Sequence, residues 1–243
     1  MDDKRGGTAI GLAGASGRCA IPFNRPTQVG DEATLMAAAM ARGQMAAGGP
    51  FTDECEQRLR DLTGAGRALL TTSATHALEM MAVLLDIGPG DEVIVPSFTF
   101  SSTASSFAMR GARPVFVDVR GDTLNLDETR VDAAVTSRTK AIVAVHYAGV
   151  GCEIETLAAI AASHGVALLE DGAQALFARY RGRPLGSAGA AAALSFHQTK
   201  NVTCGEGGAL LLNDPALFER AEVVRDKGTD RRRFVRGDVE QYT

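Results

Sequence analysis

The chain contains no tryptophan, only four cysteines and no uninterrupted apolar stretch near the roughly 20 residues that a membrane-spanning helix needs. The cysteines (Cys19, Cys55, Cys152 and Cys204) are widely spaced and form no CxxC pair. This argues against a disulfide framework or a zinc site and fits a reducing cytoplasm. Charged and glycine residues interrupt the first 20 positions, so they lack the apolar core of a secretion signal. The net charge of −4 gives no reason to expect nucleic acid or a membrane surface as the main partner.

The residues that are abundant are those of a packed core. Hydrophobic residues make up 45% of the 243 positions, and 27 positions are glycine. This length allows one large domain or two ordinary ones. Residues 1–20 show no periodicity and are rich in glycine, alanine and charge, so we expect a loose extension there, followed by one folded unit over residues 21–243.

Short apolar runs alternate along the chain with segments of helical periodicity. One helix is predicted over 31–45 and a second from an N-cap at Thr52 to a stop at Gly64. Further helices are predicted over 74–87, 101–110, 127–135, 153–164 and 214–225. Strands are predicted over 67–71, 92–95, 114–119, 141–145, 166–169, 190–196 and 209–212. The strand runs are continuously apolar, which is typical of strands buried on both faces. The pattern therefore predicts an α/β fold, a mainly parallel sheet with helices on both sides.

Ligands of such sheets bind at the carboxyl ends of the strands, so the residues that follow each strand are the informative ones. After the first strand come Ala74, Thr75 and His76, whose backbone N–H groups lie at a helix N-terminus beside several hydroxyls. A phosphate could bind there, although the same residues would also serve as an ordinary helix cap. His76 itself has no partner spacing that supports a metal or a base, and we expect a surface histidine.

Aromatic residues follow the second strand. Phe98 or Phe100 could stack on a planar ring, or both could simply fill the core, which is the commoner role of aromatic side chains.

Acidic residues end the strand over 166–169. The charge of Glu170 or Asp171 would be partly desolvated there and would need a cationic partner, such as a protonated ring nitrogen or an arginine. Gln174 lies one short turn further on and could hydrogen-bond the same ligand.

One lysine follows the strand over 190–196. Desolvation at the mouth of a core would lower the pKa of Lys200 and make its amine a nucleophile, and the hydroxyl of Ser195 could join the phosphate site. A solvated lysine in a hairpin turn is the ordinary alternative.

Together these groups meet the requirements of pyridoxal 5′-phosphate: a phosphate site, a stacking aromatic, a carboxylate for the ring nitrogen and an amine for the aldehyde. A dinucleotide site is disfavoured because no G-x-G-x-x-G opens a helix near the first strand. No metal site is expected.

Several motifs resemble the DegT/DnrJ/EryC1/StrS sugar aminotransferase family: TSATHALEM, PGDEVIVPSFTFSSTA, LNLDE, VHYAG, EDGAQ, SFHQTKN and GEGGAL. The resemblance runs from about Ile21 to the last residue and implies the large domain of a fold-type-I, pyridoxal-phosphate-dependent transferase. It implies that Lys200 binds the cofactor covalently, that Asp171 partners the pyridine nitrogen and that Gln174 lies near the ring hydroxyl. Phe100 would stack on the ring, and Ser195, Ala74 and Thr75 would hold the phosphate.

The same resemblance implies an activity and partners. The expected reaction moves an amino group from L-glutamate to C4 of a dTDP-linked keto-sugar, in a full-length homodimer. Some relatives replace the lysine with histidine and are dehydratases; Lys200 favours transamination. Relatives are normally longer and carry a smaller C-terminal domain, so we expect either a fragment or a truncated gene product. Three alternatives remain open: a non-catalytic remnant, a 3-aminotransferase for nucleotide sugars, and a fold-type-I enzyme for an amino acid.

Overall fold

The computed structural model of the chain describes residues 21–243 except 23, 44–45 and 242, so the predicted extension over 1–20 lies outside the described residues. A seven-stranded sheet has the order β1-β9-β8-β5-β4-β2-β3, and β6 and β7 form a small separate pair. The strands are β1 (Arg67–Thr71), β2 (Glu92–Pro96), β3 (Arg113–Val117), β4 (Thr139–Val145), β5 (Ala167–Asp171), β6 (Arg179–Tyr180), β7 (Arg183–Pro184), β8 (Ala191–Ser195) and β9 (Gly208–Leu212). Strand β9 is antiparallel to both of its neighbours, and the pairs from β8 to β3 are parallel.

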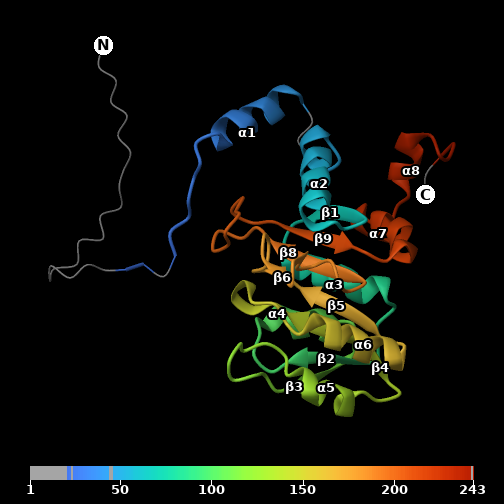
Figure 1. Cartoon of the computed structure of the whole chain (residues 1–243). Helices are drawn as coiled ribbons and strands as arrows, with labels where there is room; N and C mark the ends of the chain where they lie inside the picture. The colour runs from blue at the N-terminus through green and yellow to red at the C-terminus, as the bar shows by residue number, and fades with distance from the viewer. Residues whose placement is uncertain (1–20, 23, 44–45, 242) are drawn as a thin grey trace.

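Helices cover both faces of this sheet (Figure 1). They are α1 (Glu32–Ala41), α2 (Pro50–Thr63), α3 (Ala74–Leu84), α4 (Ser101–Ala108), α5 (Glu128–Ala134), α6 (Ile154–His164), α7 (Phe218–Arg225) and α8 (Arg231–Arg236), with 3-10 turns η1 (Tyr147–Gly149) and η2 (Pro215–Leu217). One core joins α3, α4 and α7 to one face of the sheet. Helices α5 and α6 pack on the other face, and α2 covers the β1, β9 and β8 part of it.

The strands are buried as their continuous apolar sequence predicts. Val93, Ile94 and Val95 are all 0% exposed although successive side chains point to opposite faces. Val93 and Val95 pack in the core with α3, and Ile94 packs in the core with α6. The prediction of a mainly parallel sheet with helices on both sides is confirmed.

Most predicted elements are present, with shifted ends. The Thr52 cap is wrong: α2 begins at Pro50 behind Gly49, because proline suits the first helical position, and the Thr52 hydroxyl instead accepts from the N–H of Gly48 at 3.3 Å. The Gly64 stop is confirmed, with φ of 76° in the left-handed region. The helix predicted from residue 214 to 225 begins as a 3-10 turn, with Asp214 accepting from the N–H of Ala216.

Helix α1 stands clear of the sheet (Figure 1) and contains no buried residue. Its apolar residues Leu35, Met36 and Met40 are all more than half exposed. Periodicity predicted this helix, but it is shorter than the predicted 31–45, and its apolar side packs on no described part of the core.

Candidate active site

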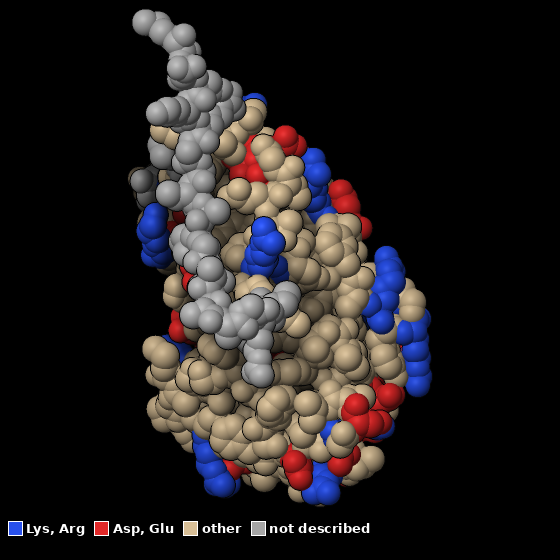
Figure 2. Space-filling view, turned by 90° about the vertical axis from the view of Figure 1, so that its left-hand side faces the viewer, with Lys and Arg blue, Asp and Glu red and all other residues tan. Residues whose placement is uncertain are grey.

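A cavity of about 940 Å³ opens at the carboxyl ends of the parallel strands. It is lined by all seven residues that the sequence singled out: Ala74, Thr75, Phe100, Asp171, Gln174, Ser195 and Lys200. They come from separate segments, which the strand order brings together. Figure 2 looks onto this end of the molecule: acidic and basic side chains gather mainly around its margin, and one basic side chain stands near the middle.

Lys200 lies in the loop that joins the neighbouring antiparallel strands β8 and β9. Its backbone N–H donates to the carbonyl of His197 at 2.9 Å, which closes the turn. Burial lowers the pKa of the Lys200 amine, and the negative charge of Asp171 opposes that effect. Lys200 does lie in a loop between paired antiparallel strands, as the ordinary alternative expected, but its side chain is partly buried and lines the cavity together with Asp171.

Asp171 is the last residue of β5 and only 5% exposed. Its Oδ2 accepts a hydrogen bond from the hydroxyl of Thr103 at 2.6 Å, and its Oδ1 accepts from the N–H of Ala173 at 3.1 Å. Thr103 is itself 0% exposed and hydrogen-bonds Thr99 at 2.8 Å. The carboxylate is therefore fixed in orientation, and each oxygen keeps a further lone pair for a ligand in the cavity.

The N-terminus of α3 lines one side of the cavity. Ser73 is the N-cap and accepts from the N–H of His76 at 3.1 Å. The N–H groups of Ala74 and Thr75 have no partner within the helix, because they belong to its first turn. Ser195 is the last residue of β8 and pairs with Gly208 on the neighbouring strand β9. Its hydroxyl accepts from the N–H of His197 at 3.3 Å and keeps its own proton to donate.

Gly208 fixes the position of this helix terminus. A Cβ atom at Gly208 would lie 2.3 Å from the carbonyl carbon of Ser73 and 2.5 Å from the nitrogen of Ala74. Only a residue without a side chain allows β9 to approach the start of α3 so closely.

The aromatic residues after β2 are exposed. Phe100 is the N-cap residue of α4 and 71% exposed, and Phe98 is 42% exposed. The alternative that both fill the core is therefore wrong. Phe98 instead pairs with Tyr147, with ring centroids 4.7 Å apart, whereas Phe100 lines the cavity and is available for the predicted stacking.

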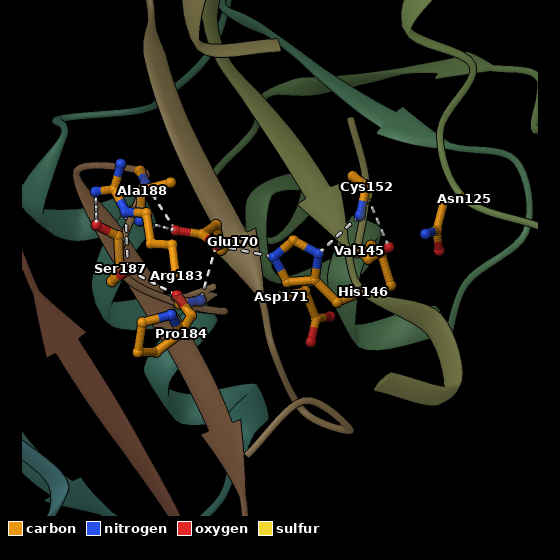
Figure 3. A network of polar contacts seen from close by, with 12 residues as sticks. Asn125, Val145, His146, Cys152, Glu170, Asp171, Arg183, Pro184, Ser187 and Ala188 are labelled. Atoms are coloured by element: carbon orange, nitrogen blue, oxygen red, sulfur yellow. Dashed lines mark hydrogen bonds and ion pairs between the residues drawn. The ribbon is translucent and has the colours of Figure 1, made fainter. Parts of the chain in front are cut away.

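Behind the cavity, Glu170 and His146 form a buried pair (Figure 3). Glu170 is 0% exposed and accepts from His146 Nε2 at 2.8 Å and from the backbone N–H groups of Gly186, Ala188 and Gly189. Burial alone would raise the pKa of Glu170, but these hydrogen bonds lower it below the usual range. Glu170 therefore has its partner within the protein, and Asp171 is the carboxylate left to face the cavity.

The histidines have structural partners. His146 Nδ1 accepts from the N–H of Cys152 at 3.2 Å, so both of its ring nitrogens are occupied. His197 Nδ1 accepts from the N–H of Thr199 at 3.2 Å and lies 3.5 Å through Nε2 from Glu206. These contacts place His197 within the turn that carries Lys200. His76 is exposed and contacts Thr72 and Glu79.

Clusters of metal-binding side chains and membrane-spanning helices were both sought in the described part of the chain. In residues 21–243 apart from the omitted positions, no three His, Cys, Asp or Glu side chains are placed to hold a metal ion. None of the helices in this part of the chain is long and apolar enough to span a membrane.

Sequence reasoning missed Thr103, Gly208 and Asn125. Thr103 and Gly208 act through contacts between segments far apart in sequence, which no local pattern indicates. Asn125 belongs to the LNLDE motif, and its side chain binds the turn that follows β4.

The model of the DegT/DnrJ/EryC1/StrS aminotransferase family matches residues 27–240. The solved structure of 3-amino-5-hydroxybenzoic acid synthase is 40% identical, with a TM-score of 0.80 over 84% of this chain and 54% of that one. DesI, solved in the presence of its TDP-sugar product, is 38% identical, with a TM-score of 0.78 over 84% of this chain and 52% of that one. The sugar aminotransferase Spr1654 of Streptococcus pneumoniae, in its PMP form, is 30% identical, with a TM-score of 0.81 over 92% of this chain and 60% of that one.

These matches confirm the expected fold class, the large domain of fold-type-I pyridoxal-phosphate enzymes. The chain spans about half the length of the solved structures it matches.

Proposed function

We propose a function from the premise that this chain belongs to the DegT/DnrJ/EryC1/StrS aminotransferase family: its cavity binds pyridoxal 5′-phosphate and serves amino transfer to a nucleotide-linked keto-sugar. The observation that carries the proposal is the convergence of Lys200, Asp171 and the N-terminus of α3 on one cavity. Packing alone does not account for this arrangement, since a buried carboxylate and a partly buried amine are costly to maintain.

The residues fit this cofactor. Asp171 is buried yet keeps acceptor capacity toward the cavity, as a protonated pyridine nitrogen requires. The N–H groups at the start of α3 and the hydroxyl of Ser195 are donors suited to a phosphate. A volume of about 940 Å³ lies at the upper end of the 300–1,000 Å³ typical of ligand sites, which leaves room for cofactor and substrate together.

When bound, pyridoxal phosphate supplies an aldehyde and an electron-withdrawing ring that stabilises negative charge on a neighbouring carbon. Lys200 would hold the aldehyde carbon through Nζ and would move the proton at Cα of the amino donor as general base and acid. The lowered pKa of Lys200 favours its neutral form, which attachment to the aldehyde and removal of the proton require. Asp171 would hold a proton at the ring nitrogen by electrostatic attraction, and Phe100 would pack on the ring. The same Lys200 amine would act first with the amino donor and then with the keto-sugar acceptor.

We further infer the substrates. L-Glutamate is the donor, and C4 of dTDP-4-dehydro-6-deoxy-D-glucose is the acceptor, giving dTDP-4-amino-4,6-dideoxy-D-galactose for a cell-surface glycan. Resemblance of the segments at Ile21 and Arg225–Gly237 to dTDP-4-amino-4,6-dideoxygalactose transaminase supports this choice, as does the TDP-sugar product of DesI. We assign residues 21–243 to the cofactor-binding large domain and residues 1–20 to an extension, and we expect the full-length protein to act as a homodimer.

The test compares the wild-type chain with Lys200→Ala and Lys140→Ala. Lys140 is exposed at the start of β4 and does not line the cavity, so it is a matched control. Wild type and K140A should take up pyridoxal phosphate, turn yellow and lose that colour with L-glutamate, whereas K200A should not develop the same absorption. Colourless wild-type protein in excess cofactor would overturn the proposal of a cofactor site.

Substrate choice needs a second assay in the full-length protein. Incubation with L-glutamate and dTDP-4-dehydro-6-deoxy-D-glucose, followed by mass spectrometry and NMR of the product, should give the 4-amino sugar. A 3-amino sugar, or turnover only with a non-nucleotide acceptor, would contradict the substrate proposal and leave the cofactor assignment standing.

A further inference from the structure

None of the residues assigned to the cofactor belongs to the LNLDE motif. Its asparagine, Asn125, is nevertheless among the most buried polar residues of the described part of the chain. Asn125 is 1% exposed, and both ends of its amide are used. Nδ2 donates to the carbonyl of Val150 at 2.9 Å, and Oδ1 accepts from the N–H of Tyr147 at 3.1 Å. Asn125 therefore holds the entry and the exit of the turn Tyr147–Gly149.

This turn is conformationally costly. Ala148 has φ of 53° and ψ of 22°, a left-handed conformation that residues with a Cβ atom seldom adopt. Such a conformation persists only where its surroundings impose it. Asn125 supplies one such constraint, and His146 supplies another, because its carbonyl accepts from the N–H of Gly149 at 3.1 Å. In Figure 3, His146 lies between Glu170 and Asn125.

The N–H of this left-handed residue points at Gln174. This N–H donates to Gln174 Oε1 at 2.5 Å. The orientation of the amide follows from chemistry, since only its oxygen can accept from an N–H group. The turn also lies close to the backbone of Gln174: a Cβ atom at Gly149 would lie 3.1 Å from the Gln174 carbonyl oxygen. With Oε1 occupied, the group that Gln174 can offer to the cavity is its NH₂.

We infer that Asn125 is a positioning residue: it holds the turn Tyr147–Gly149 so that Ala148 fixes Gln174 with its NH₂ group as a donor toward the ring hydroxyl of the cofactor. This inference rests on the proposed function. It explains why the motif carries a buried asparagine and why a strained alanine lies beside the cavity. It also gives Gln174 a defined role, because an NH₂ group that donates to the ring oxygen favours its deprotonated form over the neutral hydroxyl.

The test measures pyridoxal phosphate affinity by absorption titration, together with the pH dependence of the bound cofactor's absorption bands. The main variant is Asn125→Asp, which keeps Oδ1 but places a second carboxylate oxygen against the Val150 carbonyl. Losing a hydrogen bond to a charged oxygen weakens binding by about ten- to a hundredfold, and we expect a loss of that order in N125D and in Gln174→Ala. The titration of the absorption bands should move to higher pH in both.

A double-mutant cycle separates positioning from general damage. If Asn125 acts through Gln174, N125D should change affinity by no more than about twofold in the Gln174→Ala background. Equal losses in both backgrounds would overturn the inference. Asp127→Ala is the matched control, because it loses the cap of α5 in the same motif but does not contact the turn. It should lower thermal stability without altering affinity or absorption.

A readout without cofactor completes the design. Amide hydrogen exchange at Ala148 should be faster in N125D than in wild type or in Asp127→Ala, and unchanged exchange would contradict the inference. If N125D fails to fold, Gly149→Ala replaces it, since its Cβ atom disturbs the same turn from the side of Gln174. Wild-type protein that takes up no cofactor would instead refute the proposed function, which distinguishes the two failures.

Discussion

Gly208→Ala tests whether the close approach of β9 to α3 creates the proposed phosphate site. The added Cβ atom would lie 2.3 Å from the carbonyl carbon of Ser73, 2.5 Å from the nitrogen of Ala74 and 2.7 Å from the oxygen of Ser73. All three are backbone atoms, so no side chain can rotate away. Strand β9 is also held on both sides, with Gly208 in register with Thr71 and Ser195. The atom that must yield therefore belongs to the start of α3.

The size of the shift follows from these distances. Reaching an ordinary contact of 3.4 Å from 2.3 Å requires Ser73 and the first turn of α3 to move by at least 1.1 Å. A hydrogen bond of about 2.9 Å stretched by that amount is no longer a bond. Hydrogen bonds to a charged group contribute about 1.5–3 kcal/mol each, so loss of the two from Ala74 and Thr75 should weaken cofactor binding by at least about a hundredfold. Overpacking should also lower the free energy of unfolding by about 1–3 kcal/mol.

The assay is an absorption titration with pyridoxal phosphate, together with urea unfolding of the cofactor-free chain. Gly121→Ala is the matched control, because a Cβ atom there meets nothing within 4 Å and the residue is outside the cavity. G121A should behave as wild type in both assays. Unchanged affinity in a destabilised G208A would show that β9, not α3, yields, and would refute the argument.

Three further outcomes follow from the site. Thr103→Val removes the hydroxyl that donates to Asp171. This variant should bind the cofactor more weakly and have a free energy of unfolding lower by about 1–3 kcal/mol in urea titrations, and Thr103→Ser should restore both. Equal stability and affinity in the valine variant would contradict this. The lowered pKa of Glu170 means that its contribution to stability is present above the ordinary glutamate pKa of about 4.3 and is lost as pH falls through the lower folded value. Urea titrations between neutral and acid pH should show that loss in wild type and not in Glu170→Gln, and parallel curves would exclude it. Because burial lowers the pKa of Lys200, the rate of cofactor attachment should level off below the ordinary lysine pKa of about 10.4, and a rate still rising through that value would be incompatible with this site.

The sequence was sufficient for those parts of the site that depend on strand ends. Asp171 and Lys200 follow apolar runs that could only be buried strands, and parallel strands place their carboxyl ends together. The same logic located Ala74 and Ser195. Their roles toward the cofactor stay predictions, but their convergence on one cavity is a property of the fold.

Other features depend on register between distant segments, which no local pattern encodes. Thr103 meets Asp171 only because the fold brings α4 next to the end of β5, and the contact joins residues 68 positions apart. The choice between core packing and exposure for Phe98 and Phe100 was likewise set by tertiary context, since aromatic residues are compatible with either. The cap of α2 was predicted at Thr52 but lies at Gly49, because a glycine followed by a proline also suits the start of a helix.

The pairing of β9 with β1 predicts that the site assembles late in folding. β1 lies at the edge of the sheet and pairs only with β9, so Thr71 and Gly208 meet across 137 positions (208 minus 71). Pairings of such high contact order form slowly, because a long loop must close before any contact stabilises it. A nascent chain that has emerged only through β8 already has Asp171 and Ser195, but β1 has no neighbour and the start of α3 has no strand to rest on. Capture of the phosphate should therefore coincide with closure of the sheet, which makes cofactor colour a reporter of completed folding.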